Sequence, residues 1–210
     1  MQLTLIRHGI TEWNVIGYFQ GHSDVPLSKQ GRKQAKKLRR RFAKEADAMV
    51  FDWVYSSPLQ RAMETASIAL PQYNIISDPR LMELNFGSFE GHSIEHNQQH
   101  PDWDWWFSDP YQHPAPHGES YAMLRERAVA WLESLPSEGN VLAFSHSGTI
   151  QMLLSHIMGV EHPRWRKRIL LRHTSLTNII IRKGEPIIER VNDAKHLKML
   201  SEPSAHPFYD

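Results

Sequence analysis

The sequence has 210 residues, and its 24 Lys and Arg against 23 Asp and Glu give a formal net charge of +1 at pH 7. This length suits one domain with a sizeable core, and the nearly balanced charge argues against nucleic acid as a partner. Cysteine is absent, which excludes disulfides and thiolate metal sites and favours a reducing compartment. With no signal-peptide pattern and no apolar run of about 20 residues, we expect a cytoplasmic protein without membrane contact.

The first segment with a clear pattern is an apolar run over residues 3–6, which predicts a short buried strand. The run stops on a cation, an imidazole and a glycine, namely Arg7, His8 and Gly9. Residues 13–26 follow without a steady hydrophobic period, and we therefore expect a loop over this stretch.

A basic amphipathic segment begins after Ser28, a residue type that favours helix N-caps. Ala35, Leu38 and Phe42 recur on one side, which predicts a helix that packs this side against the core. Lys and Arg residues over 32–41 occupy the other side. We interpret this basic side as a solvated surface, with an anion-binding patch as the alternative.

A second strand is predicted over residues 52–57, with a helix directly after it. Ser57 as N-cap and Pro58 at the first helical position are typical of a helix start. This helix carries Arg61 in its first turn. A third, short strand is expected over residues 75–77.

Residues 92–118 are rich in Pro, His and Trp and interrupt the alternation of strands and helices. We interpret them as an insertion that covers the site as a lid or helical cap. We interpret their aromatic side chains first as a small satellite core that packs the insertion on the domain. Selection of apolar groups on a substrate is the alternative, and the two roles are compatible. We expect residues 1–200 to form a single domain and residues 201–210 a flexible tail.

The clearest later strand covers residues 140–146 and ends in His146 and Ser147, where a helix is expected to begin. Two further apolar stretches on either side of Gly184 predict a hairpin. Strands that alternate with helices are typical of an α/β fold with a mainly parallel sheet and helices on both faces.

Ligands of open α/β sheets bind beyond the carboxyl ends of the strands. Four side chains that follow strands are expected to meet there: Arg7, His8, Arg61 and His146. Imidazoles beside guanidinium groups are unfavourable unless an anion binds between them. A phosphoryl group fits, because Arg binds its oxygens in bidentate fashion and the helix start after His146 adds N–H donors. Gly9 is expected to let the backbone approach this phosphate closely.

A neutral histidine held against phosphorus is a nucleophile that can form a covalent intermediate. The flanking arginines favour the neutral form of His8 and stabilise charge on the transferring oxygens. The departing alkoxide needs a proton, for which Glu83 is the candidate acid. A metal site is the disfavoured alternative, because carboxylates are sparse around the two histidines and the guanidinium groups repel a cation.

The sequence resembles the histidine phosphatase superfamily, which includes cofactor-dependent phosphoglycerate mutases and broad-specificity phosphatases. Six blocks carry the resemblance in family order and span nearly the whole chain: LIRHGITEWN, FQGHSDVPLSKQGRKQA, VYSSPLQRAMETA, LMELNFGSFEG, PHGES and VLAFSHSG. The resemblance implies a three-layer α/β/α sandwich and chemistry without metal or cofactor. It also implies specific roles: His8 as phosphorylated nucleophile, Arg7, Arg61 and His146 as phosphoryl clamp, and Glu83 as proton donor.

Further positions match or depart from the family pattern. Asn14, Gln20 and Gly21 match positions that line the substrate pocket. Ser147 stands where a second glycine is common, and its hydroxyl is a candidate substrate contact. Ile10 stands where an acidic residue is common, and we expect it to make the mouth of the site less acidic.

The run from Gly87 to Gly91 looks more like the phosphatase branch than the mutase branch of this family. The insertion also lacks a convincing lysine and paired arginines for a second phosphate. We therefore expect hydrolysis of small phosphomonoesters, with a phosphoglycerate mutase or a non-catalytic phosphate-binding module as alternatives. A homodimer through a sheet edge or the hairpin is an open option.

Overall fold

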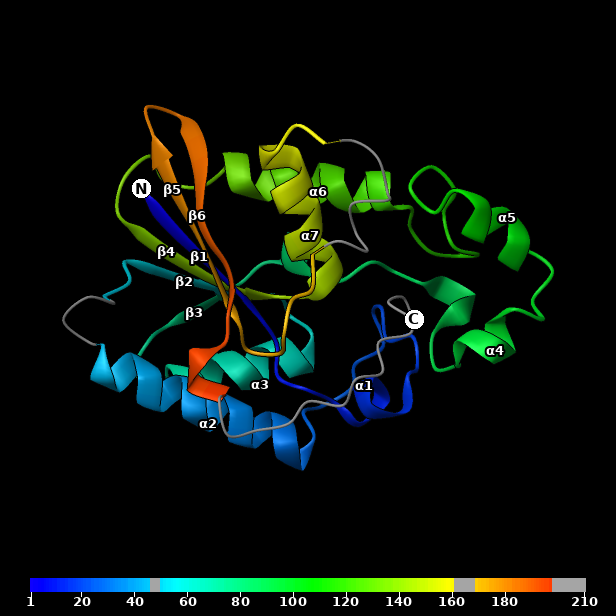
Figure 1. Ribbon diagram of the computed structural model, residues 1–210, viewed down its shortest axis with the longest axis horizontal. Coiled ribbons are helices and arrows are strands. Elements are labelled where there is room, and N and C mark those ends of the chain that lie inside the picture. Colours follow the sequence, from blue (N-terminus) through cyan, green and yellow to red (C-terminus); the bar gives the residue numbers. More distant parts are fainter. Residues whose placement is uncertain (46–49, 161–168, 198–210) are drawn as a thin grey trace.

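Figure 1 shows the computed structural model, which describes residues 1–45, 50–160 and 169–197. The strands in these residues are β1 (Gln2–Arg7), β2 (Trp53–Ser56), β3 (Ile75–Ser77), β4 (Asn140–Ser145), β5 (Leu176–Arg182) and β6 (Glu185–Asp193). They form one six-stranded sheet in the order β3-β2-β4-β1-β5-β6. The first four strands are mutually parallel, and β5 and β6 form an antiparallel hairpin beside β1. The predicted mainly parallel sheet and the late hairpin are confirmed.

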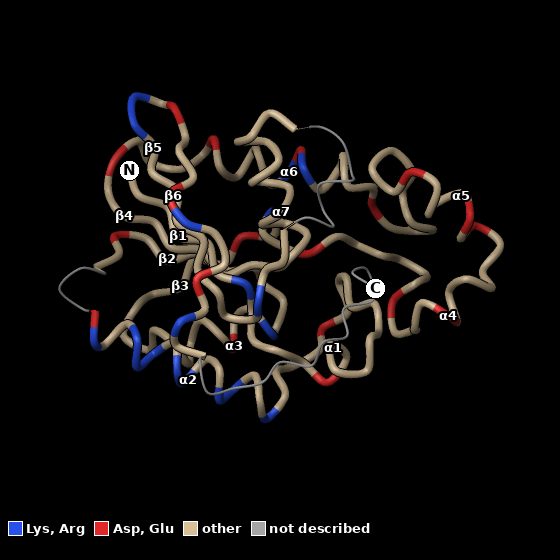
Figure 2. The backbone as a smooth tube through the Cα atoms, in the orientation of Figure 1, with Lys and Arg blue, Asp and Glu red and all other residues tan. Residues whose placement is uncertain are grey.

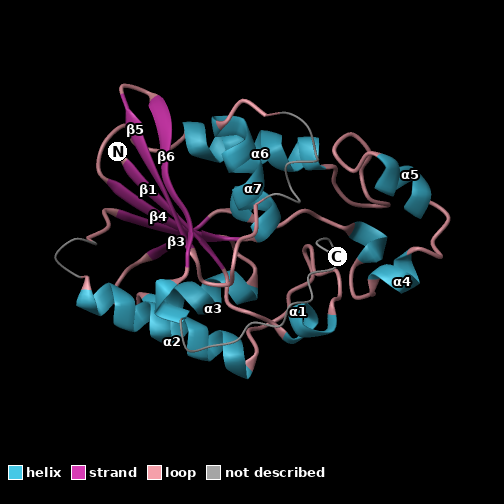
Figure 3. Cartoon of the chain, in the orientation of Figure 1, coloured by secondary structure: helices cyan, strands magenta, loops and turns pink. Residues whose placement is uncertain are grey.

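Helices cover both faces of this sheet, as Figure 3 shows. The helices of the described residues are α1 (Glu12–Ile16), α2 (Lys29–Lys44), α3 (Gln60–Ala69), α4 (Ile94–Asn97), α5 (Trp103–Ser108), α6 (Tyr121–Glu133) and α7 (Ser147–Ile157). One buried cluster joins α2 and α3 to the sheet, and another joins α6 and α7 to the opposite face. The chain is therefore a three-layer α/β/α sandwich.

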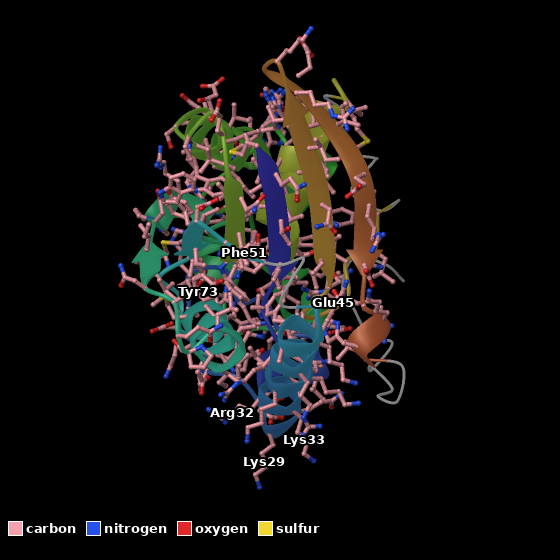
Figure 4. The ribbon with its side chains drawn as sticks, turned by 90° about the vertical axis from the view of Figure 1, so that its left-hand side faces the viewer. Lys29, Arg32, Lys33, Glu45, Phe51 and Tyr73 are labelled. Carbon is pink, nitrogen blue, oxygen red and sulfur yellow. The ribbon has the colours of Figure 1, made fainter. Side chains whose placement is uncertain are left out.

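Helix α2 forms as predicted. Ser28 caps it, since its Oγ accepts a hydrogen bond from the N–H of Gly31 at 3.0 Å. Ala35, Leu38 and Phe42 are buried against the sheet. Most of the basic side chains lie on the opposite side. Figure 2 shows the Lys and Arg positions along α2, and Figure 4 shows Lys29 and Lys33 pointing away from the sheet into solvent.

Two local expectations are wrong. The stretch predicted as a loop contains the short helix α1, which begins after Thr11 in a capping box with Asn14. Helix α3 begins at Gln60 rather than at Pro58, and Ser57 is not its N-cap. The N–H of Gln60 is instead bound by Asp24 Oδ1 at 2.6 Å, so a carboxylate from a distant loop caps this helix.

The insertion over residues 92–118 contains α4 and α5, which lie beyond the carboxyl ends of the parallel strands (Figure 1). Trp103 and Trp106 are buried in an aromatic cluster with Phe19 and Phe89. The expectation of a satellite core is confirmed, and a role as a lid stays a prediction. Residues 201–210 lie outside the described part of the chain. Within that part, no helix is long and apolar enough to cross a membrane.

Candidate active site

Strand pairing brings the two predicted histidines together. β1 and β4 are neighbours and run parallel, with Arg7 opposite Ser145. His8 and His146, the next residues of the two strands, therefore leave the same edge of the sheet side by side. Their ring centroids are 5.1 Å apart, and both side chains are buried. Residues almost 140 positions apart thus meet as the strand order requires.

The ring of His8 is oriented by its neighbour. Its Nδ1 lies 2.7 Å from the carbonyl oxygen of Gly9. A carbonyl oxygen only accepts hydrogen bonds, so Nδ1 carries the proton and donates it. This tautomer leaves the lone pair on Nε2, which is the nitrogen that can attack an electrophile.

Burial keeps both imidazoles neutral. The pKa of His8 lies well below its usual range, first because of desolvation and then because of His146, Arg61 and Arg7. Desolvation also lowers the pKa of His146 well below its usual range, with Arg61 as the next cause. Near pH 7 the pair therefore adds no positive charge of its own, and His8 has the protonation state that a nucleophile needs.

Arg61 is placed by both α3 and the loop before α2. Its side chain is fully buried and donates to the carbonyl oxygens of Gly21 at 2.6 Å and Ser23 at 2.9 Å. Burial lowers its pKa to about 10, so the guanidinium remains a cation at neutral pH. Its Nε has no hydrogen-bond partner within the described residues.

Of the two ring nitrogens of His146, one is hydrogen-bonded and the other has no partner among the described residues. Its Nε2 lies 2.8 Å from Ser57 Oγ, while its buried Nδ1 has no partner in the described part of the chain. Ser57 Oγ also accepts from the N–H of Leu59 at 3.3 Å, which leaves the hydroxyl proton free to point at Nε2. In that arrangement Nδ1 carries the proton of His146 and is a buried donor without an acceptor among the described residues.

Arg7 lies at the end of β1 with its side chain buried. Its Nη1 donates to the carbonyl oxygen of Leu171 at 2.5 Å. Arg7 also lies within electrostatic reach of His8, His146 and Arg61, because it lowers the pKa of each of them. The structure therefore brings together the four side chains predicted as the phosphoryl clamp and nucleophile.

Glu83 lies beside the start of α7. Its Oε2 accepts from the N–H of Gly148 at 3.1 Å, and its Oε1 accepts from its own neighbour, the N–H of Leu84, at 2.9 Å. A Cβ at position 148 would lie 2.3 Å from Oε1 of Glu83. The carboxylate therefore occupies space that only glycine leaves open at the N-terminus of the helix that follows His146.

Two residues of the first loop make contacts that the sequence did not predict. A Cβ on Gly9 would lie 2.9 Å from the carbonyl oxygen of Gly31 in α2, so packing against this helix is one structural reason for a glycine here. Close approach of the Gly9 backbone to phosphate stays a prediction. Ile10 is buried, and its N–H donates to Gln34 Oε1 at 2.9 Å, while its effect on the charge at the mouth of the site stays a prediction.

The predicted substrate-binding residues lie near this cluster, but with other contacts. Asn14 Oδ1 accepts from Thr11 in the cap of α1, and Gln20 Oε1 accepts from Thr11 Oγ1 at 2.8 Å. The carbonyl oxygen of Gly21 binds Arg61, and Ser147 is the nearly buried first residue of α7. Contact of these residues with substrate stays a prediction.

Sequence reasoning missed two polar residues of the site. Ser57 follows β2 and reaches His146, so the rule about carboxyl ends of strands could have found it. His173 precedes β5, and its ring centroid lies 5.5 Å from that of His8. Because β5 is antiparallel, its amino end reaches the same edge, and only the strand direction could have revealed this.

Each of the three imidazoles at this edge has one ring nitrogen engaged within the protein. Nδ1 of His8 and Nδ1 of His173 each face a carbonyl oxygen, and Nε2 of His146 faces Ser57. Within the part of the chain that the structure describes, no group of three or more His, Asp or Glu side chains could hold a metal ion.

The match to known proteins covers nearly the whole chain. The model of the histidine phosphatase superfamily (branch 1) matches residues 3–194. The chain belongs to this superfamily. This membership and the phosphatase-named relatives below make it a phosphatase by family.

The similar proteins are named either as phosphatases or as phosphoglycerate mutases. The chain is 31% identical over 168 residues to phosphoserine phosphatase 1 of Hydrogenobacter thermophilus, which covers 77% of this chain and 78% of the relative. It is 32% identical to the probable phosphoglycerate mutase GpmB of Yersinia enterocolitica, over 95% of this chain and 96% of the relative. A crystal structure of an Entamoeba histolytica phosphoserine phosphatase variant in complex with phosphoserine superimposes with a TM-score of 0.80 at 29% identity, covering 93% and 98% of the two chains.

Proposed function

We propose that this enzyme hydrolyses small phosphomonoesters through a phosphohistidine on Nε2 of His8. The observation that carries the proposal is the pair of buried nitrogens without a partner, Nε of Arg61 and Nδ1 of His146, in the cluster around His8. A buried donor that lacks an acceptor costs about 1–3 kcal/mol. A bound phosphoryl group supplies acceptor oxygens for both.

The first step forms the covalent intermediate. Nε2 of His8 attacks phosphorus, the phosphorus–oxygen ester bond breaks, and protonated Glu83 gives its proton to the departing oxygen, which leaves as an alcohol. The carbonyl oxygen of Gly9 accepts from Nδ1–H of His8 and stabilises the imidazolium that forms. Arg7, Arg61 and His146 stabilise charge on the three remaining phosphoryl oxygens.

The second step reverses the proton transfer. The carboxylate of Glu83 takes a proton from water as the water oxygen attacks phosphorus. The phosphorus–nitrogen bond then breaks, which releases inorganic phosphate and neutral His8. Glu83 ends the cycle protonated, so protons balance over the two steps.

Substrate and reaction outcome need a direct assay, because relatives carry both phosphatase and mutase names. The assay compares phosphate release from an aryl phosphate, phosphoserine and 3-phosphoglycerate, with a chelator present throughout. We expect release without added metal. Interconversion of phosphoglycerates that depends on a bisphosphorylated primer, with little net phosphate release, would instead identify a mutase. Absence of both would favour the non-catalytic module.

The nucleophile is tested by His8→Ala. We expect this variant to lose turnover. Quenching in denaturing alkali with labelled substrate should trap phosphate that acid then releases on the wild type but not on this variant. His156→Ala, in the last turn of α7, is the matched control and is expected to keep both signals. Normal turnover of the His8 variant would overturn the scheme.

The remaining partner assignments are also proposals. The absence of cysteine supports a cytoplasmic setting. The near-zero net charge supports a small phosphate ester rather than nucleic acid as the partner. Measurement of the mass in solution decides whether the chain forms a homodimer.

A further inference from the structure

Residues 171–174, which we call the clamp segment, hold the end of β1 at several points. Nη1 of Arg7 donates to the carbonyl oxygen of Leu171 at 2.5 Å. In the other direction, the N–H of Thr174 donates to the carbonyl oxygen of Arg7 at 2.9 Å and lies 3.4 Å from that of His8. A segment that is more than 160 positions away in the sequence therefore fixes both peptide groups next to the nucleophile.

His173 makes the most direct contact of this segment. Its Nδ1 lies 3.1 Å from the carbonyl oxygen of His8, which can only accept, so Nδ1 of His173 carries a proton and donates it. Its ring packs against the ring of His8 with 5.5 Å between centroids and an interplanar angle of 58°. The side chain is only 6% exposed, so this contact forms inside the protein.

The backbone next to His173 is strained. Thr174 has φ of 56°, in the left-handed region that a β-branched residue rarely adopts. Its Oγ1 lies 3.0 Å from Nε2 of His196 in the 3₁₀ helix η4 (Lys195–Leu197), and this contact holds the residue in place. Such strain persists only where surrounding contacts enforce it, and it is found preferentially at functional sites.

We propose that His173 is a positioning residue for the nucleophile. Its N–H fixes the carbonyl group of His8, its ring limits rotation of the His8 imidazole, and Nε2 of His8 is thereby kept in line for attack on phosphorus. The inference rests on the proposed function, in which His8 is the residue that becomes phosphorylated. His173 itself does not touch the reacting atoms.

A displaced nucleophile reacts slowly even when substrate still binds. Loss of a group that orients a reacting residue typically costs about 10–100-fold in rate. The predicted effect therefore falls on the rate of phosphoenzyme formation and on kcat. Substrate affinity should change less, because Arg7, Arg61 and His146 remain in place.

The experiment compares His173→Leu with His173→Asn in the full-length chain. The two replacements have nearly the same shape, but only Asn offers an N–H near the position of Nδ1. Rapid quenching in denaturing alkali, in which phosphohistidine is stable, measures the rate and the amplitude of phosphoenzyme formation from labelled aryl phosphate. We expect His173→Leu to form the phosphoenzyme about 10–100-fold more slowly at an unchanged folded fraction by circular dichroism, and His173→Asn to recover most of the rate.

The outcomes separate positioning from a structural role. A lower amplitude at unchanged rate in His173→Leu would mean a smaller folded fraction and would overturn the proposal. Equal rates for the Leu and Asn variants would overturn it as well, since the donor would then not matter. If the Leu variant does not fold, the Asn variant must still form phosphoenzyme within a few-fold of the wild-type rate, and failure there overturns the proposal. Absence of acid-labile phosphate on the wild type would refute the proposed function itself, which is a distinguishable result.

Discussion

The two central imidazoles differ in where they hold their protons. His8 donates Nδ1–H to Gly9, so the lone pair is on Nε2 and suits attack. His146 is oriented through Nε2 by Ser57, so its proton is best placed on Nδ1 and suits donation to an oxygen. One residue type therefore serves as nucleophile and as hydrogen-bond donor because each ring has a different neighbour.

Gly148 provides a prediction at the residue scale. Alanine at this position should favour helix α7 by up to about 1 kcal/mol. Its Cβ, however, would lie 2.3 Å from Oε1 of Glu83 and must displace the carboxylate. We therefore expect Gly148→Ala to keep its thermal stability while kcat falls by about 100-fold. Thermal unfolding and steady-state kinetics on the same preparation measure both quantities.

Ser155→Ala is the control on the same helix. It removes a buried hydroxyl that has no hydrogen-bond partner among the described residues, and we expect little change in kcat. Full activity of Gly148→Ala would show that the position of Glu83 seen here is not needed for proton transfer.

At the scale of elements, α6 fastens the segment that carries Glu83. Arg127 donates to the carbonyl oxygens of Arg80, Met82 and Glu83 at 2.7 to 3.0 Å. It also binds Glu119 through two nitrogens, each at 2.9 Å. One guanidinium thus holds the backbone on which the candidate proton donor sits.

We expect Arg127→Met to weaken both the fold and the reaction. Removal of the guanidinium leaves partly buried carbonyl groups and the carboxylate of Glu119 without their partner, which should lower the free energy of unfolding by about 1–3 kcal/mol. The loss of kcat should persist at temperatures where the variant is fully folded, because Glu83 is no longer held. Denaturant unfolding and kinetics at low temperature check this.

Arg125→Met is the comparison variant on the same helix. Arg125 contacts His156 on α7 at 3.4 Å instead of the segment that carries Glu83. We expect it to change kcat little. Equal losses in the two variants would argue against a specific role for Arg127.

Sequence patterns predicted the strands well and some helix starts poorly. The short apolar runs of β1 and β4 and the cap of α2 carry strong local signals. Helix α3 was misplaced because Asp24, far away in sequence, binds its first N–H. Helix α6 was not assigned, although Ser120 caps it and Leu124, Ala128 and Trp131 form its buried side.

At the scale of the molecule, the site was predictable to the extent that it follows from parallel strands. Arg7, His8 and His146 meet because β1 and β4 are parallel neighbours. Alternating strands and helices imply the shared direction, whereas the pairing of β1 with β4 is a property of the observed strand order. His173 and the clamp segment were not predictable in this way. Their place depends on the antiparallel direction of β5, which no local pattern before that strand encodes.

Buried neutral histidines also make the stability of the whole molecule depend on pH. The folded-state pKa values of His8 and His146 lie well below their usual range because of burial, and burial lowers the pKa of His196 to about 4. In the unfolded chain these groups take up protons near pH 6.5. Below that pH the unfolded state therefore binds more protons than the folded state, and the free energy of unfolding falls.

We expect the thermal midpoint to fall as the pH is lowered from about 6.5 toward 5. Carboxylates contribute at lower pH. Burial raises the pKa of Asp193, but hydrogen bonds from Arg41 outweigh burial and lower this pKa below its usual range. The stability that Asp193 contributes is therefore lost only as the pH falls below the usual carboxyl range. Calorimetry at several pH values between about 6.5 and 5 tests this expectation. His196→Asn should make the dependence of the thermal midpoint on pH less steep. A midpoint that rises between pH 6.5 and 5 would contradict this account.

The hairpin between β5 and β6 turns at Lys183 and Gly184, both with positive φ, at the end of the sheet away from His8 (Figure 1). Gln2, which pairs with Ile180 near this turn, is six residues before His8, so about 20 Å of strand separates the turn from the nucleophile. A peptide tag or fluorophore grafted at this tip would project away from the catalytic edge. The enzyme could thus be anchored to a solid support there with its reactive face open to solution.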